Sequence, residues 1–285
     1  MVSVSMITYK HELYIREAIE GVLMQQVNFP VELIIADDCS PDNTSIIVEE
    51  IIKNHPNGHW IKYFRHPQNI GMQPNGLFAS EHCSGRYIAV CEGDDYWTDS
   101  NKLQKQVDFL EGNPQIIATF HNTEERCFDG LLSSKLYINK FETSQIFPIQ
   151  DMLEFNIVPT SSLVFRKAYL PAEIKSSNFC NLHFGDWPLN LLLARNGDFY
   201  YIPFIMSVRR MHQNSIWGMQ EHSENIRKTV ESLNAMISYN WFDKEVNIKL
   251  ERTIELLQNK NKSKGLMHYL LNKIINVLVK IKNKT

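Results

Sequence analysis

Short runs of branched apolar residues alternate with segments of helical periodicity over the first 120 residues, and this alternation restricts the fold more than any other feature. We expect strands over residues 2–7, 32–36, 60–65, 87–91 and 116–120. Strands that alternate with helices are typical of βαβ units, whose strands pair in parallel. The pattern therefore predicts an α/β fold with a mostly parallel, twisted sheet flanked by helices.

Helix signals occupy the segments between these strands. A helix over residues 12–25 is predicted by apolar residues at helical spacing: Ile15, Ala18, Ile19, Val22 and Leu23. Ser40-Pro41-Asp42-Asn43 supplies turn and N-cap residues before a second helix, which carries Ile46, Ile47, Ile51 and Ile52. Further helices are expected over residues 76–82 and after Asp99, where Gly112-Asn113-Pro114 marks the end.

The pattern becomes less regular from about residue 123. We expect short helices over residues 151–155 and 187–195 and strands over residues 161–165 and 199–205, in a region that closes over the sheet edge. Residues 221–259 have a helical pattern, and residues 264–282 form a basic amphipathic stretch. We therefore expect one main domain over residues 1–220 and a helical C-terminal extension over residues 221–285.

Charge and cysteine usage exclude several classes of protein. The 29 basic and 32 acidic side chains leave a formal charge of −3, so we expect no nucleic-acid partner. The five cysteines are widely spread and never form the close pairs of a zinc knuckle or a redox dithiol, which is typical of thiols in a reducing compartment. The start MVSVSMITY has no signal-peptide pattern, and no apolar run is long enough to span a bilayer, so we expect a cytoplasmic location.

Two acidic groups directly follow expected strands. Asp37-Asp38 comes after VELIIA, and Glu92-Gly93-Asp94-Asp95 comes after RYIAV. Ligands of open α/β sheets bind at the carboxyl ends of the strands, so both groups fall on the functional edge. Adjacent carboxylates repel one another. A bound Mg²⁺ or Mn²⁺ ion, which substrate phosphates would also coordinate, compensates this repulsion simply. A solvated turn explains Asp37-Asp38 equally well, whereas three acids followed by two aromatic residues are unusual for a plain turn.

Other phosphate-binding and hydrolytic motifs are missing from the sequence. There is no GxxxxGK(S/T) loop and no GxGxxG motif after the first expected strand, which disfavours P-loop enzymes and dinucleotide dehydrogenases. HExxH and GxSxG are absent as well, so nothing indicates a zincin or an α/β-hydrolase.

Taken together, five segments resemble the family 2 glycosyltransferases of the GT-A fold, over roughly residues 2 to 215. In chain order they are VSVSMITYKHELYIREAIEGVLMQQ, ELIIADDCSPDNT, NIGMQPNG, SGRYIAVCEGDDYWTDSNKLQKQVDFLEGNP and FGDWPLNLLLARNGDFYYIPFIMSVRRMHQNSIWG. One segment alone is only suggestive, but five in order on the expected strand and helix ends are highly specific. The resemblance implies a Rossmann-like GT-A domain, with residues 1–122 as the nucleotide-sugar-binding half and residues 123–220 as the acceptor-side half.

The resemblance also implies a nucleotide pocket. By position, Thr8 and Tyr9 line this pocket, with Tyr9 close to the base, and Asp38 accepts a hydrogen bond from the base. Asn75 matches an Asn on the family's helix after the third strand. The preceding residue, often Arg in relatives, is Pro74 here, so a diphosphate contact from that position is in doubt.

The reacting groups follow from the same comparison of motifs. Asp94 is expected near the ribose or diphosphate and Asp95 is the favoured ligand of Mn²⁺ or Mg²⁺, with Asp94 as a second metal ligand. Asp186 matches the family's catalytic base, although an isolated Asp at a helix start is more often an N-cap. Arg210, His212 and Ser215 match a segment that relatives use near the diphosphate, while a lone His there is more often structural.

The implied activity is a metal-dependent, inverting transfer of a sugar from a nucleoside diphosphate to an acceptor hydroxyl. A UDP-sugar is the favoured donor, with thymidine next, and a saccharide or lipid-linked saccharide is the expected acceptor. The resemblance places this reaction in surface polysaccharide, capsule or lipopolysaccharide synthesis in bacteria.

Two other functions remain open. A sugar-phosphate nucleotidyltransferase also places carboxylates and a metal at a sheet edge, but MVSVSMITYKHE lacks its Gly-rich basic loop. A non-catalytic nucleotide-binding domain is the other alternative, although the donor acids and the base candidate occur together. The stretch 264–282 fits a helix on the inner face of the cell membrane, or equally a packing or homodimerisation helix.

Overall fold

The computed structural model describes residues 1–127, 134–138, 141–212 and 221–259. The chain forms two compact units, Met1–Met219 and Gln220–Thr285. The second unit contains α7 (His222–Ser238) and a further helix over residues 244–259, whereas the amphipathic stretch 264–282 lies outside the described residues. None of the helices in the described ranges is long and apolar enough to cross a bilayer.

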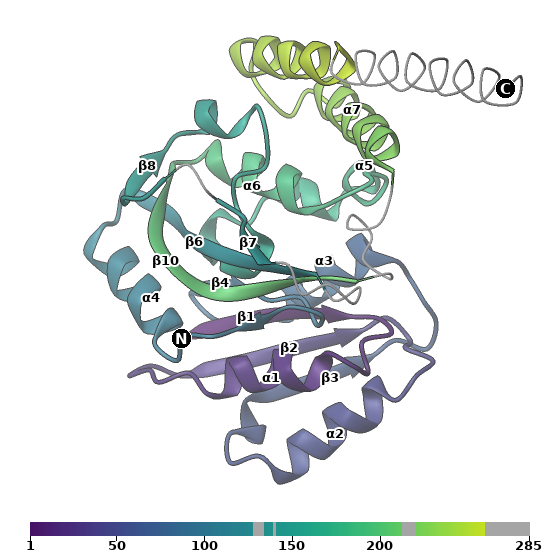
Figure 1. Cartoon of the computed structure of the whole chain (residues 1–285), viewed down its shortest axis with the longest axis vertical. Helices are drawn as coiled ribbons and strands as arrows, with labels where there is room; N and C mark the ends of the chain where they lie inside the picture. Colours follow the sequence, from purple (N-terminus) through teal and green to yellow (C-terminus); the bar gives the residue numbers. More distant parts are fainter. Residues whose placement is uncertain (128–133, 139–140, 213–220, 260–285) are drawn as a thin grey trace, which may run out of the picture. The chain divides into compact units, whose positions relative to one another are not determined.

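The first unit is built on one mixed sheet, which Figure 1 shows between its helices. Four strands pair in parallel in the order β3-β2-β1-β4: β3 (Ile61–Arg65), β2 (Val31–Asp37), β1 (Val2–Thr8) and β4 (Tyr87–Val90). The order reverses direction between β1 and β4, so the carboxyl ends of these two strands form a topological switch point. Ligand sites of open α/β sheets lie at such points.

The other side of the sheet is mixed. β9 (Val164–Arg166) runs antiparallel between β4 and β6 (Ile116–Cys127), and β10 (Asp198–Met211) pairs with β6 in parallel. Short antiparallel strands complete it: β5 (Tyr96–Trp97) and β8 (Gln145–Phe147) on β10, and β7 (Ser134–Leu136) on β6. The predicted α/β class with a mostly parallel sheet is confirmed.

Alternation along β1 explains how the helices cover this sheet. Val2, Val4 and Met6 belong to one buried apolar cluster with the inner face of α1 (Ile15–Leu23). α2 (Thr44–Asn54) and α4 (Lys102–Gly112) contribute to the same cluster. The intervening residues of β1 point to the opposite face, where α3 (Met72–His82) packs against β1 and β2. Figure 1 shows α1 and α2 on one side of these strands and α3 on the other.

Three predicted boundaries were wrong for identifiable reasons. The helix expected from residue 76 begins at Met72, because Pro74 lies in the first turn, where a missing N–H costs nothing. The helix expected over residues 151–155 is a short 3₁₀ helix, Ile149–Met152. The strand expected over residues 161–165 is the 3₁₀ helix Thr160–Ser162 followed by β9, because the Ser162 hydroxyl donates to the Pro159 carbonyl at 2.6 Å and closes a turn.

The two longest strands also exceed their predicted lengths. β6 continues to Cys127 and β10 to Met211, where the sequence indicated ends near residues 120 and 205. The register of β10 on β6 shifts between Ile202 and Ser207, around Pro203. Proline has no N–H to donate to a neighbouring strand, so this bulge lets the strand continue past it. The extension carries Arg209 and Arg210 toward the end of β4.

Glu32 of β2 ties together the parallel half of the sheet. Its carboxylate accepts hydrogen bonds from Ser3 of β1, from Lys62 of β3 at 2.6 Å, and from the backbone N–H and hydroxyl of Ser84 at 2.6 and 2.7 Å. The side chain is 7% exposed. Burial alone would raise the pKa of Glu32, but the hydrogen bonds from Lys62, Ser3 and Ser84 outweigh it and lower the pKa to about 2.

We expect Glu32→Gln to lower the free energy of unfolding at pH 7 by about 3 kcal/mol. Because the folded-state pKa of Glu32 is depressed, its contribution is present above the unfolded value of 4.5 and is lost as pH falls from there toward 2. Urea unfolding followed by circular dichroism should therefore show a smaller difference between the two proteins at pH 3.5 than at pH 7. Glu50→Gln, at an exposed pair with Arg16, is the control and should cost less than about 1 kcal/mol. A pH-independent loss for Glu32→Gln would contradict the assignment.

Candidate active site

The acidic loop after β4, residues 91–95, is held on both sides by backbone pairing. The N–H groups of Cys91 and Gly93 donate to the carbonyls of Ser5 and Ile7 on β1, at 3.1 and 3.0 Å. Directly after the loop, β5 pairs with β10 through Trp97 and Ser207. The loop is therefore fixed at the switch point between β1 and β4, as expected for strand ends on the functional edge.

Gly93 allows this loop to approach the end of β1 closely. A Cβ atom at Gly93 would lie 2.9 Å from both the Cβ and the Oγ1 of Thr8 and 2.9 Å from Nδ1 of His11. Contacts of that length do not occur between such atoms, so only glycine fits. Thr8 Oγ1 and His11 Nδ1 are both buried and have no hydrogen-bond partner among the described residues. Buried polar atoms without a partner are rare in proteins, and two of them at one strand end favour a polar ligand at this place.

Asp94 is flanked by two imidazoles. One of its carboxylate oxygens lies 3.1 Å from Nε2 of His212 and 3.8 Å from Nε2 of His11. Burial would raise the pKa of Asp94, but the two histidines outweigh it and hold the pKa at about 2. Burial also lowers the pKa of His11, in spite of the attraction of Asp94. Asp94 is therefore a carboxylate at neutral pH.

Asp95 and Glu92 have the opposite character. Asp95 is 3% exposed, and its carboxylate accepts the backbone N–H of Arg210 at 3.0 Å. Burial and the charge of Asp94 raise the pKa of Asp95 to about 7. Burial, with repulsion from Asp94, Asp95 and Asp186, raises the pKa of Glu92 well above its ordinary value. The loop thus concentrates more negative charge than its surroundings compensate.

Arg210 braces this loop from the side of β10. Its guanidinium donates to the Asp94 carbonyl at 2.6 Å and pairs with Glu17 of α1. It also lies between two aromatic rings, 4.3 Å from the centroid of Tyr96 and 5.4 Å from that of Tyr14. Arg210 is 4% exposed. These contacts account for Arg210 without a ligand, although the sequence had suggested a place near a diphosphate.

Arg209, which sequence analysis missed, lies on the opposite face of β10. It lines a cavity together with Glu92 and Asp186, and its guanidinium donates to Glu125 at 2.9 Å. Nearby Tyr137, Asp95, Glu125 and Glu92 raise its pKa despite burial. Neighbouring residues on a strand point to opposite faces, so from the sequence either Arg209 or Arg210 could have faced the acidic loop.

Three predicted nucleotide-pocket residues surround the carboxyl ends of β1 and β2. The Asp38 carboxylate accepts the N–H groups of Ile70 and Gly71 at 2.6 and 2.9 Å, which fixes the loop before α3. Asn75 is buried, donates to the Ala36 carbonyl at 2.9 Å and contacts a His66 ring nitrogen at 3.0 Å. Tyr9 is 38% exposed and presents its ring to solvent. Asp38 and Asn75 are therefore occupied by hydrogen bonds within the protein, whereas the Tyr9 ring is exposed.

Asp186 is the first residue of α6 (Asp186–Ala194). The preceding residue, Gly185, occupies the N-cap, and no side chain caps this helix. The Asp186 carboxylate instead accepts a hydrogen bond from Asn156 at 2.8 Å. Burial raises the pKa of Asp186, and the N–H groups of the first turn, Arg209 and Asn156 oppose the increase. This is the environment of a carboxyl group that exchanges a proton closer to neutrality than an exposed Asp does.

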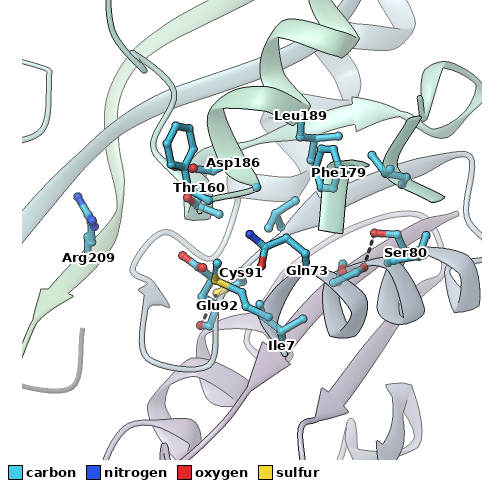
Figure 2. Close-up of a pocket in the computed structure, with 18 residues that line it drawn as sticks. Ile7, Gln73, Ser80, Cys91, Glu92, Thr160, Phe179, Asp186, Leu189 and Arg209 are labelled. Atoms are coloured by element: carbon cyan, nitrogen blue, oxygen red, sulfur yellow. Dashed lines mark hydrogen bonds between the residues drawn. The ribbon is translucent and has the colours of Figure 1, made fainter. Parts of the chain in front are cut away.

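A cavity of about 180 Å³ connects these groups. Figure 2 shows Asp186 above it and Glu92 below it, with Arg209 at the left and Phe179, Leu189 and Ser80 at the right. The two carboxyl groups, which come from opposite halves of the first unit's sequence, therefore face one space. Ser215, the remaining predicted residue, lies outside the described residues.

A divalent metal fits the donors of the acidic loop only in part. Among the described residues, no three His, Cys, Asp or Glu side chains converge tightly enough to hold an ion alone. The mutual repulsion of Glu92, Asp94 and Asp95 nevertheless favours an added cation. Mg²⁺ and Mn²⁺ are commonly bound by one or two carboxylates with the rest of their ligands from substrate phosphates, which suits this donor set.

Comparison with known families gives a match over most of the first unit. The family model described as Glycosyl transferase family 2 matches residues 3–170. An uncharacterized protein of Mycobacterium tuberculosis is 34% identical over 215 residues, which are 75% of this chain and 60% of that protein. The chain thus spans about 60% of the length of that relative. The Escherichia coli enzyme UDP-Glc:alpha-D-GlcNAc-diphosphoundecaprenol beta-1,3-glucosyltransferase WfgD is 27% identical, over 76% of this chain and 79% of the enzyme.

Solved structures with the same fold support the architecture. Staphylococcus aureus TarS 1–349 in complex with UDP-GlcNAc superposes with a TM-score of 0.63 at 16% identity, covering 92% of this chain and 72% of that chain. The mannosyltransferase PcManGT from Pyrobaculum calidifontis, in complex with GDP-Man and Mn²⁺, gives a TM-score of 0.63 at 15% identity, covering 91% and 70%. At these identities the likeness shows the fold alone.

Replacing Arg210 with Met tests whether it braces the loop. The change keeps most of the side-chain volume but removes the donors to Asp94 and Glu17, so we expect the free energy of unfolding to fall by about 2–4 kcal/mol. Arg16→Met, at an exposed pair, is the control, with an expected loss below about 1 kcal/mol. Urea unfolding measures both. Unchanged stability with weakened nucleotide binding would instead show that Arg210 serves the ligand directly.

Proposed function

The chain belongs to glycosyltransferase family 2, and on this premise we propose that it transfers a sugar from a nucleoside diphosphate sugar to a hydroxyl group of an acceptor. The observation that carries the proposal is the cavity shared by Glu92 and Asp186 beside the Asp94 loop. A transferase needs one group to hold the departing diphosphate and another to take the acceptor proton. We assign the first role to the acidic loop, which reaches the cavity through Glu92, and the second to Asp186.

The donor nucleotide is assigned to the ends of β1 and β2. The exposed ring of Tyr9 suits stacking on the base, and the orphaned hydroxyl of Thr8 suits a polar contact beside it. A UDP-sugar is preferred over a thymidine nucleotide. The names of the E. coli relative and of the TarS complex, which specify UDP-Glc and UDP-GlcNAc, support this preference.

The sequence motif favoured Asp95 as the metal ligand, with Asp94 second, but we assign the divalent metal to Asp94, which has His212 beside it. Asp94 is more exposed than Asp95 and stays ionised, whereas Asp95 is occupied by the Arg210 N–H. When bound, Mn²⁺ or Mg²⁺ supplies Lewis-acid stabilisation of the negative charge that develops on the diphosphate. Asp95 and Arg210 keep the loop in place, and Asp94 orients the diphosphate side of the donor.

Asp186 is the group we assign as catalytic base. An acceptor hydroxyl is a poor nucleophile at neutral pH, so its proton must pass to a carboxylate as the oxygen attacks. In the step, the acceptor oxygen bonds to C1 of the sugar, the bond from C1 to the diphosphate oxygen breaks, and the hydroxyl proton moves to Asp186. Asp186 lies across the cavity from the acidic loop, which suits attack from the face opposite the leaving group and inversion at C1.

The acceptor is proposed to be a saccharide, free or linked to a lipid, in the synthesis of a surface polysaccharide. The name of the E. coli relative specifies a diphosphoundecaprenol-linked acceptor, which supports a lipid-linked class. Such an acceptor would place the enzyme at the inner face of the cell membrane.

The test is release of nucleoside diphosphate from a panel of UDP- and dTDP-sugars with Mn²⁺ or Mg²⁺, followed by simple and lipid-linked acceptors. We expect Asp186→Asn to lower transfer by about 10²–10⁴-fold, because the amide cannot accept the proton, while donor affinity by calorimetry stays within about twofold. Full transfer by the variant would remove Asp186 from this role. Pyrophosphate release from a nucleoside triphosphate and a sugar phosphate would indicate a nucleotidyltransferase, and donor binding without turnover a binding domain.

The pH dependence of kcat/KM tests the same carboxyl group. Burial raises the pKa of Asp186, so the acidic limb should lie above the ordinary value of 3.8 for Asp. Asn156 donates to the ionised form and opposes that rise, so Asn156→Ala should move the limb to higher pH and leave the plateau rate within about threefold. Asn234→Ala, on the exposed face of α7, is the control and should not move it. If the acidic limb of kcat/KM lies at the same pH in Asn156→Ala as in the unchanged protein, Asp186 is not the group that sets it.

A further inference from the structure

The cavity beside Asp186 extends well past the charged groups. It passes between α3 on one side and the α5 (Ser177–Cys180) and α6 region on the other. Its far walls are apolar, formed mainly by Leu77, Ile174, Phe179, Phe184 and Leu189. At about 180 Å³, the cavity is large enough for a substituent of a sugar as well as part of its ring.

Gly76 leaves part of this space open. It lies inside α3, on the face that also presents Gln73, Leu77 and Ser80 to the cavity. A Cβ atom at Gly76 would have no neighbour within 4 Å, so nothing in the described protein excludes a side chain there. Glycine inside a helix costs about 1 kcal/mol relative to Ala. A position that bears this cost without a packing reason, on a cavity wall, is explained by room for a ligand.

We propose that this cavity receives the acetamido group of a 2-acetamido-2-deoxy sugar carried by the nucleoside diphosphate donor, an inference that rests on the proposed function. The reacting carbon C1 must lie between the acidic loop and Asp186. C1 is bonded to C2 and to the ring oxygen, and of these two atoms only C2 bears a substituent, which we place in the inner cavity. A substituent on C6 is separated from C1 by the ring oxygen, C5 and C6.

The few polar groups of the inner cavity match an amide. The Gln73 side chain is fixed because its NH₂ group donates to the Leu182 carbonyl at 2.6 Å. No described residue donates to its side-chain oxygen, which is therefore suited to accept the N–H of an acetamido group. The hydroxyls of Ser5 and Thr160 also line the cavity and suit the acetamido carbonyl. Figure 2 shows Gln73 to the right of Asp186 and Glu92, at a height between them.

A plain hydroxyl at C2 fits this cavity poorly. It would leave the apolar walls without contact and the Gln73 oxygen without the amide donor, and unpaired polar groups or lost apolar contacts each reduce affinity. Differences of this kind give selectivity between donors of about 10–200-fold. We therefore expect kcat/KM for UDP-GlcNAc or UDP-GalNAc to exceed that for UDP-Glc or UDP-Gal by about tenfold or more.

The first experiment measures these four donors and dTDP-rhamnose on the full chain with Mn²⁺. Saturation-transfer NMR on UDP-GlcNAc should give its strongest protein signal at the acetyl methyl group. A kcat/KM for UDP-Glc, UDP-Gal or dTDP-rhamnose equal to or above that of both acetamido donors would overturn the proposal. If no nucleoside diphosphate sugar reacts or binds, the proposed function fails instead, so the two failures are distinct.

The second experiment fills the cavity from α3. Gly76→Ala and Gly76→Leu should lower kcat/KM for the acetamido donors progressively, by about threefold and by about tenfold or more, and leave UDP-Glc within about twofold. Both changes replace a helical glycine by a better helix former, so stability should not fall. Gly112→Ala, at the end of α4 where a Cβ is equally free of contacts, is the matched control and should change neither donor. Equal losses for all donors, or a rise in acceptor KM alone, would show that the acceptor occupies the cavity and would refute the inference.

Discussion

Repulsion among the carboxylates of Glu92, Asp94 and Asp95 is the constraint around which the site is organised. These groups are largely removed from water at the end of β4, where each opposes the ionisation of the others. The first unit compensates them unevenly. His11 and His212 stabilise the charge of Asp94, and the backbone N–H of Arg210 donates a hydrogen bond to Asp95. Under the proposed function, a cation that binds together with the donor would compensate the repulsion that remains.

The sheet topology explains why these groups meet. The strand order turns at β1 and β4, which leaves the carboxyl ends of both strands uncovered by a crossover helix. β10 then returns alongside β6 and brings its two arginines to the same edge, one on each face. Arg210 stabilises the loop from its outer side, whereas Arg209 reaches the cavity. Asp186 arrives from a separate helix, so acid loop and base are positioned independently.

Much of the fold and part of the candidate site could be predicted from the sequence. The features that could not be predicted were missed for physical reasons. The alternation of strand and helix patterns predicted the parallel half, because each such element carries its own periodicity. The motifs located the acidic loop and Asp186 but did not separate Arg209 from Arg210, since that depends on the pleat of β10 past a bulge at Pro203. Gln73 and Gly76 escaped notice because a residue that lines a cavity has no local signature. Asn156 was missed because its partner, Asp186, is 30 residues away in the chain.

The cavity wall on α3 and the charged residues at the strand ends belong to different elements, so they can change independently in sequence. The residues assigned to the diphosphate stand at strand ends, where a change disturbs a network of buried charges. The wall formed by Gln73, Gly76 and Leu77 belongs to a single exchangeable helix face. Point changes on that face alter the space offered to the sugar without touching the charged groups. Under the proposed function, such changes would alter the choice of donor sugar while the residues assigned to the transfer step stay the same.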